Sequence, residues 1–144
     1  MLLARGAARP DNPPMYERKT RQILVAVRPA YLDDQSDPEG DRYVWSYTVT
    51  IENRGEESVQ LMSRYWNIVD GVGRVKEIRG PGVVGAQPVI APGESFEYTS
   101  GCPLETASGL MSGRYQMKAA SGEAFEAEIP LFLLESPYEQ RQIH

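Results

Sequence analysis

The sequence predicts an all-β fold, an antiparallel β-sandwich of seven to eight strands. Apolar and aromatic residues alternate with polar ones over short stretches, at the period of two that is typical of a half-buried strand. Turn-forming Gly, Pro, Asn and Asp residues separate these stretches at the near-regular spacing of a sandwich. No stretch of eleven or more residues shows the three-to-four residue apolar spacing of a helix, so we expect almost no helix.

Length and composition set the broad class of protein. The chain has 144 residues, which is enough for one domain with its own core, and a formal net charge of −5. An acidic chain lacks the basic face that general nucleic-acid binding requires. A single cysteine, Cys102, excludes an internal disulfide and suits a reducing compartment. No apolar run approaches the roughly 18 residues of a membrane span, and the first residues turn polar too quickly for a secretory signal. We therefore expect a cytoplasmic protein without a membrane or nucleic-acid partner.

The first strands follow a short extension. Residues 1–20 are predicted to be a flexible N-terminal extension, because their proline-rich stretch cannot build a regular element. Apolar residues alternate from Ile23 to Val27, which predicts a strand, and Pro29 indicates an edge position or a bulge. The acidic residues 33–41 carry hard oxygen ligands but lack the twelve-residue calcium loop, so we interpret them as a solvated turn.

The middle of the chain carries the clearest strand, over residues 43–52, followed by another over residues 59–69. In the second of these the faces are ambiguous, because apolar residues occur on both sides, which indicates a central strand. Arg64 lies in that strand and is a candidate anion ligand; the other interpretation is that its stem covers an aromatic ring and its guanidinium pairs with a carboxylate. A short strand follows over residues 74–78.

The second half continues the alternation. Strands are predicted over residues 95–99, 113–119 and 125–129, and residues 102–109 are predicted to connect the first two. Pro130 interrupts pairing before an apolar end, and residues 137–144 are predicted to be a flexible C-terminal tail. The domain therefore spans residues 21–136. The predicted core comprises Val25, Trp45, Tyr47, Val49, Ile51, Trp66, Phe96, Tyr98, Tyr115, Met117, Phe125 and Ile129.

A glycine-rich stretch after residue 79 has the spacing G-x-G-x-x-G, formed by Gly80, Gly82 and Gly85. This spacing is typical of a dinucleotide-binding turn, which requires a strand before it and a helix after it. The strand is predicted, but Pro88 and a following Pro-Gly pair stand where the helix would run. We therefore interpret the stretch as a loop between two strands, in which successive N–H groups can still form an anion-binding nest.

The same stretch continues into a long block that resembles the ApaG family. The block reads VVGAQPVIAPGESFEYTS over residues 83–100, and the resemblance extends upstream through RYVWSYTVTIENRG and VQLMSRYWNIVDG and downstream through FEAEIPLF. It covers residues 21–136, nearly the whole predicted domain. The resemblance implies a fibronectin type III-like or immunoglobulin-like sandwich. It also implies an indirect link to magnesium and cobalt homeostasis, without an established biochemical activity.

The sequence contains few residues that could form a catalytic site. The only histidine is the terminal His144, which removes Ser-His-Asp and Cys-His catalysis and any zinc site of ordinary composition. Cys102 has no activating cation or helix end near it in the sequence. We therefore expect no enzyme activity, no catalytic residues, no metal site and no cofactor.

Two classes of function remain. The first is a non-catalytic protein-interaction module, which the resemblance favours because similar domains inside larger eukaryotic proteins look like binding modules. The second is a small-ligand binder that holds phosphate or pyrophosphate on the loop of residues 80–85. A third, structural interpretation is that the glycines only fix the loop against the sandwich. We expect a protein partner of unknown identity and a monomer or weak homodimer. The candidate partner- or anion-binding residues are Arg79, Gly80, Gly82, Gly85 and Gln87.

Overall fold

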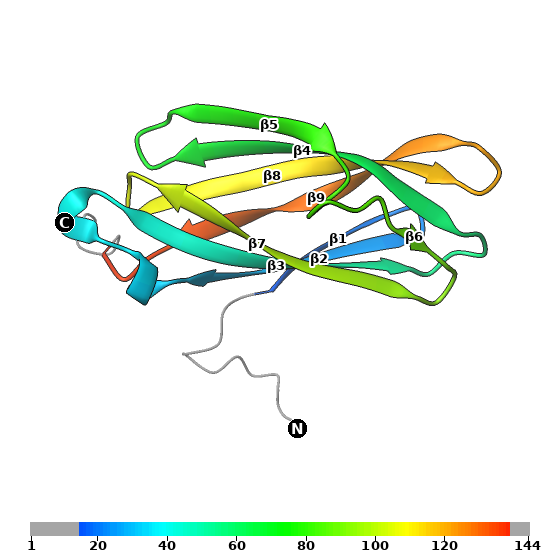
Figure 1. Ribbon diagram of the computed structural model, residues 1–144, viewed down its shortest axis with the longest axis horizontal. Coiled ribbons are helices and arrows are strands. Elements are labelled where there is room, and N and C mark those ends of the chain that lie inside the picture. The colour runs from blue at the N-terminus through cyan, green and yellow to red at the C-terminus, as the bar shows by residue number, and fades with distance from the viewer. Residues whose placement is uncertain (1–14, 139–144) are drawn as a thin grey trace, which may run out of the picture.

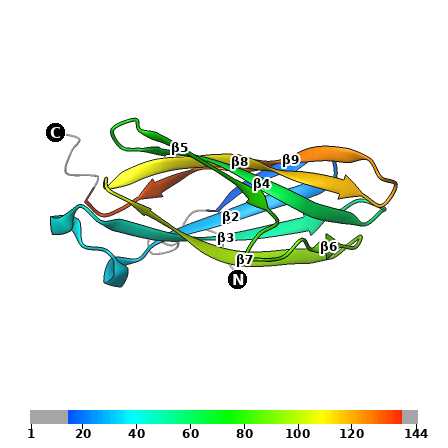
Figure 2. The same cartoon turned by 45° about the horizontal axis from the view of Figure 1, so that its top comes forward.

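A computed structural model describes residues 15–138, which form two packed antiparallel sheets (Figures 1 and 2). The β-sandwich predicted from the sequence is confirmed. The four-stranded sheet has the order β1 (Tyr16–Thr20), β2 (Ile23–Tyr31), β3 (Tyr43–Asn53), β7 (Ser95–Leu104). The five-stranded sheet has the order β5 (Val75–Pro81), β4 (Val59–Asp70), β8 (Ser108–Ala119), β9 (Ala124–Glu135), and the two-residue β6 (Val89–Ile90) also pairs with β4. Two short 3-10 turns, Asp33–Gln35 and Pro38–Gly40, lie between β2 and β3.

The core fills the space between the sheets, as the alternation predicts. Ten of the twelve predicted core residues are buried, and the other two, Phe96 and Phe125, are partly buried and pack against the core. The aromatic centre is Tyr47, Trp66 and Phe132, whose rings contact one another at centroid distances of 5.2–6.0 Å. Edge-on and tilted rings at these distances add to the burial of their apolar area.

The first strand corrects the predicted N-terminal boundary. Tyr16–Thr20 pairs with β2 along its whole length, so the prediction that residues 1–20 are an unstructured extension is wrong for this segment. Its sequence, YERKT, shows little apolar alternation because only its two ends face the protein. The Tyr16 ring packs against Phe132, and the Thr20 hydroxyl accepts a hydrogen bond from the N–H of Glu128. Residues 1–14 lie outside the described residues.

A β-bulge at Met62 explains the ambiguous faces of β4. Leu61 pairs with Met117 and Ser63 pairs with Gln116, so Met62 is an extra residue in β4. The inward face therefore changes parity along the strand: Leu61 is buried before the bulge, and Trp66 is buried after it. Strict alternation cannot describe a strand that contains a bulge, and for this reason both faces looked partly apolar.

The prolines lie where strand pairing tolerates them. Pro29 pairs with Tyr47 of β3 but lies beyond the end of β1, which begins opposite Val27. The register between β8 and β9 shifts between Met111 and Gly113, opposite Pro130, as predicted. These positions lack a ladder partner on one side, so the missing N–H of proline disturbs no hydrogen bond.

The hairpin from β7 to β8 is longer than predicted. Residues 102–104 and 108–109 belong to strands, so the predicted connection is wrong and only residues 105–107 form the turn. Cys102 pairs with Trp45 and is buried, and Pro103 is tolerated because β7 is the outermost strand of its sheet. Of the predicted C-terminal tail the structure describes two residues, and one of them, Tyr138, packs its ring against Tyr31 at 6.4 Å.

Candidate functional site

The glycine-rich segment between β5 and β6 leaves the edge of the five-stranded sheet and leads toward β7 (Figure 1). It contains a two-residue turn. The N–H of Val83 donates to the carbonyl of Ala86, and the N–H of Ala86 donates to the carbonyl of Val83, both at 2.8 Å. The two central residues, Val84 and Gly85, have positive φ angles of 42° and 81°, which is the pattern of a type I′ turn. We call residues 83–86 the Val84 turn.

The Val84 turn is fixed to the bulge in β4. The carbonyl of Met62 accepts two hydrogen bonds at 2.9 Å, one from the N–H of Gly82 and one from the side-chain amide of Gln87. The side chain of Gln60 in turn donates to the carbonyl of Gln87 at 3.0 Å. Val83 is buried in the core. The bulge supplies an unpaired carbonyl, and the segment 82–87 satisfies it, so the two irregular features stabilise each other.

Arg64 holds the start of the segment. Its Nη1 donates to the carbonyls of Pro81 at 3.0 Å and Gly82 at 2.9 Å. A Cβ at Gly80 would lie 3.0 Å from both terminal nitrogens of Arg64, so glycine at this position makes room for the guanidinium. The bulge places Arg64 on the same face of β4 as the buried Trp66, two residues further on. The guanidinium therefore binds backbone carbonyls of the segment, a role that neither sequence interpretation of Arg64 included.

Only glycine fits at position 82, because of its backbone conformation and the space around it. Its φ is 58°, and a Cβ there would lie 2.1 Å from the carbonyl oxygen of Ala86. The N–H groups of Gly82, Val83 and Ala86 all donate to backbone carbonyls, so these three are not free to bind an anion. The segment leads into strand β6 rather than a helix, so the dinucleotide spacing lacks the helix N-terminus that such a turn requires.

Arg79 points in another direction. It lies on the outer face of the five-stranded sheet, with its guanidinium 4.6 Å from the ring centroid of Tyr65. Arg114 lies over the same ring at 4.2 Å and forms an ion pair with Glu126 at 3.3 Å. Of the five predicted site residues, Gly80, Gly82 and Gln87 fix the segment, Gly85 forms the turn, and Arg79 belongs to the sheet face.

Val84 is the residue of this segment that sequence reasoning missed. Its side chain is 60% exposed, and its positive φ is uncommon for a β-branched residue. Such a conformation costs on the order of 1–3 kcal/mol and persists only where the surroundings impose it. Here the hydrogen bonds donated by Gly82, Gln87 and Arg64 hold the segment, and Val84 with it, in this conformation. The only sequence signal is a β-branched residue at a turn position where Asn, Asp or Gly is preferred.

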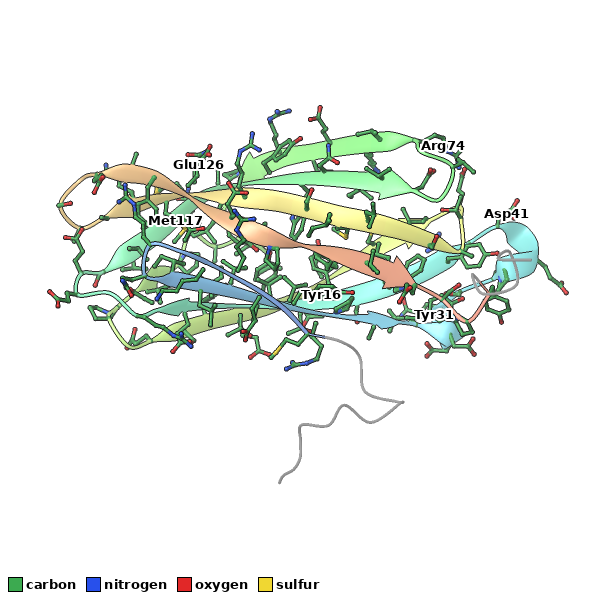
Figure 3. The ribbon with its side chains drawn as sticks, turned by 180° about the vertical axis from the view of Figure 1, so that it is seen from behind. Tyr16, Tyr31, Asp41, Arg74, Met117 and Glu126 are labelled. Carbon is green, nitrogen blue, oxygen red and sulfur yellow. The ribbon has the colours of Figure 1, made fainter. Side chains whose placement is uncertain are left out.

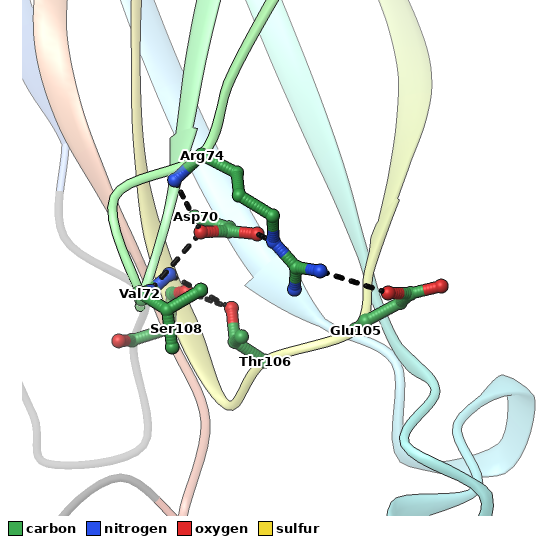
Figure 4. A network of polar contacts seen from close by, with 7 residues as sticks. Asp70, Val72, Arg74, Glu105, Thr106 and Ser108 are labelled. Carbon is green, nitrogen blue, oxygen red and sulfur yellow. Dashed lines mark hydrogen bonds and ion pairs between the residues drawn. The ribbon is translucent and has the colours of Figure 1, made fainter.

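A polar network joins two turns at one end of the sandwich (Figure 4). Asp70 accepts hydrogen bonds from the N–H groups of Val72 and Arg74 and binds the guanidinium of Arg74 at 2.6 Å. Desolvation opposes ionisation of Asp70, but the hydrogen bonds from Arg74 and Val72 hold the pKa of Asp70 below its ordinary value. Arg74 also reaches Glu105 at 3.4 Å, and the hydroxyl of Thr106 accepts from the N–H of Gly71 at 2.9 Å. The network fixes the β4–β5 turn to the β7–β8 turn.

Buried ionisable groups lie on the inner face of β7 and β8. The hydroxyls of Tyr98 and Tyr115 form a hydrogen bond of 2.5 Å, and burial raises the pKa of each. Burial also raises the pKa of the Cys102 thiol from 9.0 to about 11, although Lys76 opposes the shift. All three groups are therefore protonated at neutral pH. Within residues 15–138, no three His, Cys, Asp or Glu side chains are grouped so that they could hold a metal ion, the acidic segment 33–41 included.

Fold and site together define a class: small all-β domains in which a glycine-rich connection is fixed to the edge of a sandwich. A family model described as the ApaG domain matches residues 33–119. Protein ApaG of Parvibaculum lavamentivorans is 57% identical over 130 residues, covering 90% of this chain and 100% of that protein. Protein ApaG of Rhodospirillum centenum is 61% identical over 124 residues, covering 86% and 95%. The chain therefore belongs to the ApaG family.

A solved structure agrees with this assignment. The crystal structure of a putative ApaA protein from Bordetella pertussis superposes with a TM-score of 0.79 at 48% identity, covering 90% of this chain and 99% of that chain. The part of the chain that the structure describes contains no helix that is long and apolar enough to cross a membrane.

Proposed function

We propose that this protein is a non-catalytic, cytoplasmic protein-interaction module of the ApaG type, and that its docking point is the Val84 turn. The observation that carries the proposal is the conformation of Val84: an exposed, β-branched side chain held at positive φ by its neighbours. A strained residue at an exposed tip contributes nothing to the core, and such strain is concentrated at functional sites. A rigid loop on a sandwich also loses little entropy when it binds.

Two further observations support this proposal. A second apolar side chain, Val89 of β6, is also exposed, at 63%. The raised pKa values of Cys102, Tyr98 and Tyr115 leave these groups protonated and buried, which argues against their use as nucleophiles or bases. We propose that the link to magnesium and cobalt homeostasis is indirect and acts through the bound protein.

The test is capture of partners from a native lysate of the source cells, with the full chain as bait. Val84→Asn is the test variant, because asparagine accepts a positive φ and replaces the apolar side chain. Val72→Asn is the matched control, since Val72 is 69% exposed on a different turn. We expect Val84→Asn to lose specifically captured proteins that the wild type and Val72→Asn retain. Equal capture by all three baits would overturn the docking site. Turnover of a nucleotide or phosphoester by the purified protein, abolished by one substitution in residues 79–87, would overturn the non-catalytic assignment.

A further inference from the structure

The outer face of the five-stranded sheet carries an apolar row that crosses four strands. In the register of the sheet, Val69 of β4 lies opposite Val75 of β5 on one side and Leu110 of β8 on the other, and Leu110 lies opposite Leu133 of β9. Val75 is 60% exposed and Leu133 is 39% exposed, and Leu131, next along β9, is 59% exposed. Neighbouring apolar side chains of this kind on one sheet face are a mark of an interaction surface.

A charged row runs parallel to the apolar row, four residues earlier in β4 and four residues later in β5 and β8. Tyr65 of β4 lies opposite Arg79 of β5 and Arg114 of β8, and Arg114 lies opposite Glu128 of β9. The two arginines hold the Tyr65 ring between them. The row therefore has a cation at the β5 edge and a carboxylate at the β9 edge. In Figure 3, Glu126 and Arg74 lie toward opposite ends of this sheet.

These two rows are self-complementary under a two-fold rotation. The rotation axis runs parallel to the strands, in front of the outer face and midway between β4 and β8. Rotation about this axis places β5 of one copy against β9 of the other, and β4 against β8. The apolar row then meets the apolar row of the second copy, because its order Val75, Val69, Leu110, Leu133 is apolar throughout. In the charged row, Arg79 meets Glu128 of the partner subunit, and Tyr65 meets Arg114 of the partner subunit.

We propose that this face binds a second copy of the chain and forms a symmetric, face-to-face dimer. Aligned sheets pack about 10 Å apart with a rotation of about 30°, which keeps opposed rows in contact near the axis. Four strands spaced about 4.8 Å apart give a face roughly 15 Å wide, so the contact is of modest area and the dimer is weak. The dimer leaves the Val84 turn free, since that turn is fixed to the edge of the sandwich, so this proposal does not depend on the proposed function.

The test is sedimentation velocity over a concentration series with a charge-reversal cycle. We expect Arg79→Glu and Glu128→Arg each to raise the dimer dissociation constant at least about tenfold, because each places like charges opposite one another. The double variant is expected to restore it to within about threefold of the wild type. Within one chain β5 and β9 are separated by β4 and β8, so restoration requires a contact between copies.

Glu56→Arg is the control, since it makes the same charge reversal on an exposed turn away from this sheet face. Each variant's Tm is measured to confirm that it is folded. A chain that stays monomeric up to millimolar concentration would overturn the proposal. The proposal would also be overturned if Arg79→Glu and Glu128→Arg changed the dimer dissociation constant no more than Glu56→Arg does. The same holds if the double variant did not restore the dissociation constant that the single variants raise.

Discussion

The guanidinium of Arg64 lies directly against the backbone of Gly80, within 3.0–3.1 Å of the position that a Cβ would occupy. This contact allows Arg64 to reach the two carbonyls that begin the glycine-rich segment. We expect Arg64→Met to keep the packing of the stem but lose both hydrogen bonds, at a cost of about 1–3 kcal/mol in the free energy of unfolding. Urea denaturation measures the loss. Arg64→Lys should recover part of it, and a stability equal to wild type in Arg64→Met would show that the guanidinium does not fix the segment.

Gly82 and Gly85 both have positive φ but differ in the space around them. A Cβ at Gly82 would lie 2.1 Å from the carbonyl oxygen of Ala86, whereas nothing lies within 4 Å of a Cβ at Gly85. Gly82→Ala should therefore cost more than about 2 kcal/mol, because it adds a clash to the backbone strain. Gly85→Asn, which tolerates the left-handed conformation, should cost less than about 1 kcal/mol. Equal losses of Tm in the two variants would contradict the steric account.

Trp45 is the largest of the fully buried side chains and also closes the end of the sandwich. It is 1% exposed, and its indole N–H donates to the carbonyl of Glu135 at 2.9 Å. Trp45→Ala removes the packing and leaves that carbonyl without its donor, so we expect a loss of about 3–5 kcal/mol, which is a large share of the stability of a small domain. Thermal unfolding followed by circular dichroism checks this expectation. A Tm within two degrees of wild type would show that Trp45 is not part of the core.

Cys102 gives the stability a defined pH dependence. Its pKa is raised from 9.0 to about 11 in the folded protein, so between these values the unfolded chain loses a proton that the folded protein keeps. The stabilising contribution is complete below pH 9 and is lost as the pH rises through 11, at no more than about 1.4 kcal/mol per pH unit. The free energies of unfolding of wild type and Cys102→Ala should therefore change in parallel up to pH 8.5, and the wild type should fall more steeply from pH 9 to 10.5. If the free energies of unfolding of the two proteins changed in parallel over the whole pH range, the thiol would not be buried.

Much of the fold was predictable because its strands follow simple alternation. In β3, the alternating residues from Trp45 to Ile51 face the core as predicted. The exceptions have physical causes. Tyr16–Thr20 is too polar to show a pattern and is a strand because it pairs with β2. The bulge at Met62 changes the parity of β4, and no local signal marks it. The bulge lies in pairing with β8, a segment distant in the sequence, whereas β1 pairs with the adjacent β2 and lacks an apolar pattern of its own.

The candidate site was predicted in part. The sequence correctly indicated that no helix follows the glycines and that Gly82 and Gly85 lie in a loop. The predicted loop position of Gly80 is wrong, because β5 extends to Pro81 and Gly80 pairs with Arg64. The sequence also did not indicate what holds the loop. Its fixed geometry comes from Met62 and Arg64, which lie about 20 residues earlier in the chain. The role of Val84 was not apparent, because the sequence predicts a loop here but not the backbone conformation of its residues. Its positive φ angle, which only the structure gives, is what marks Val84 as unusual.

If Val84 serves binding rather than stability, as proposed above, replacing it should not weaken the fold, and the free energy of unfolding of Val84→Asn measures this. Asparagine relieves the strain of a β-branched residue at φ 42° and removes no buried contact, since Val84 is 60% exposed. We expect urea denaturation at 25 °C to give a free energy of unfolding equal to that of the wild type or about 0.5–1 kcal/mol higher. A variant less stable than the wild type by more than about 1 kcal/mol would overturn this role, because Val84 would then stabilise the fold.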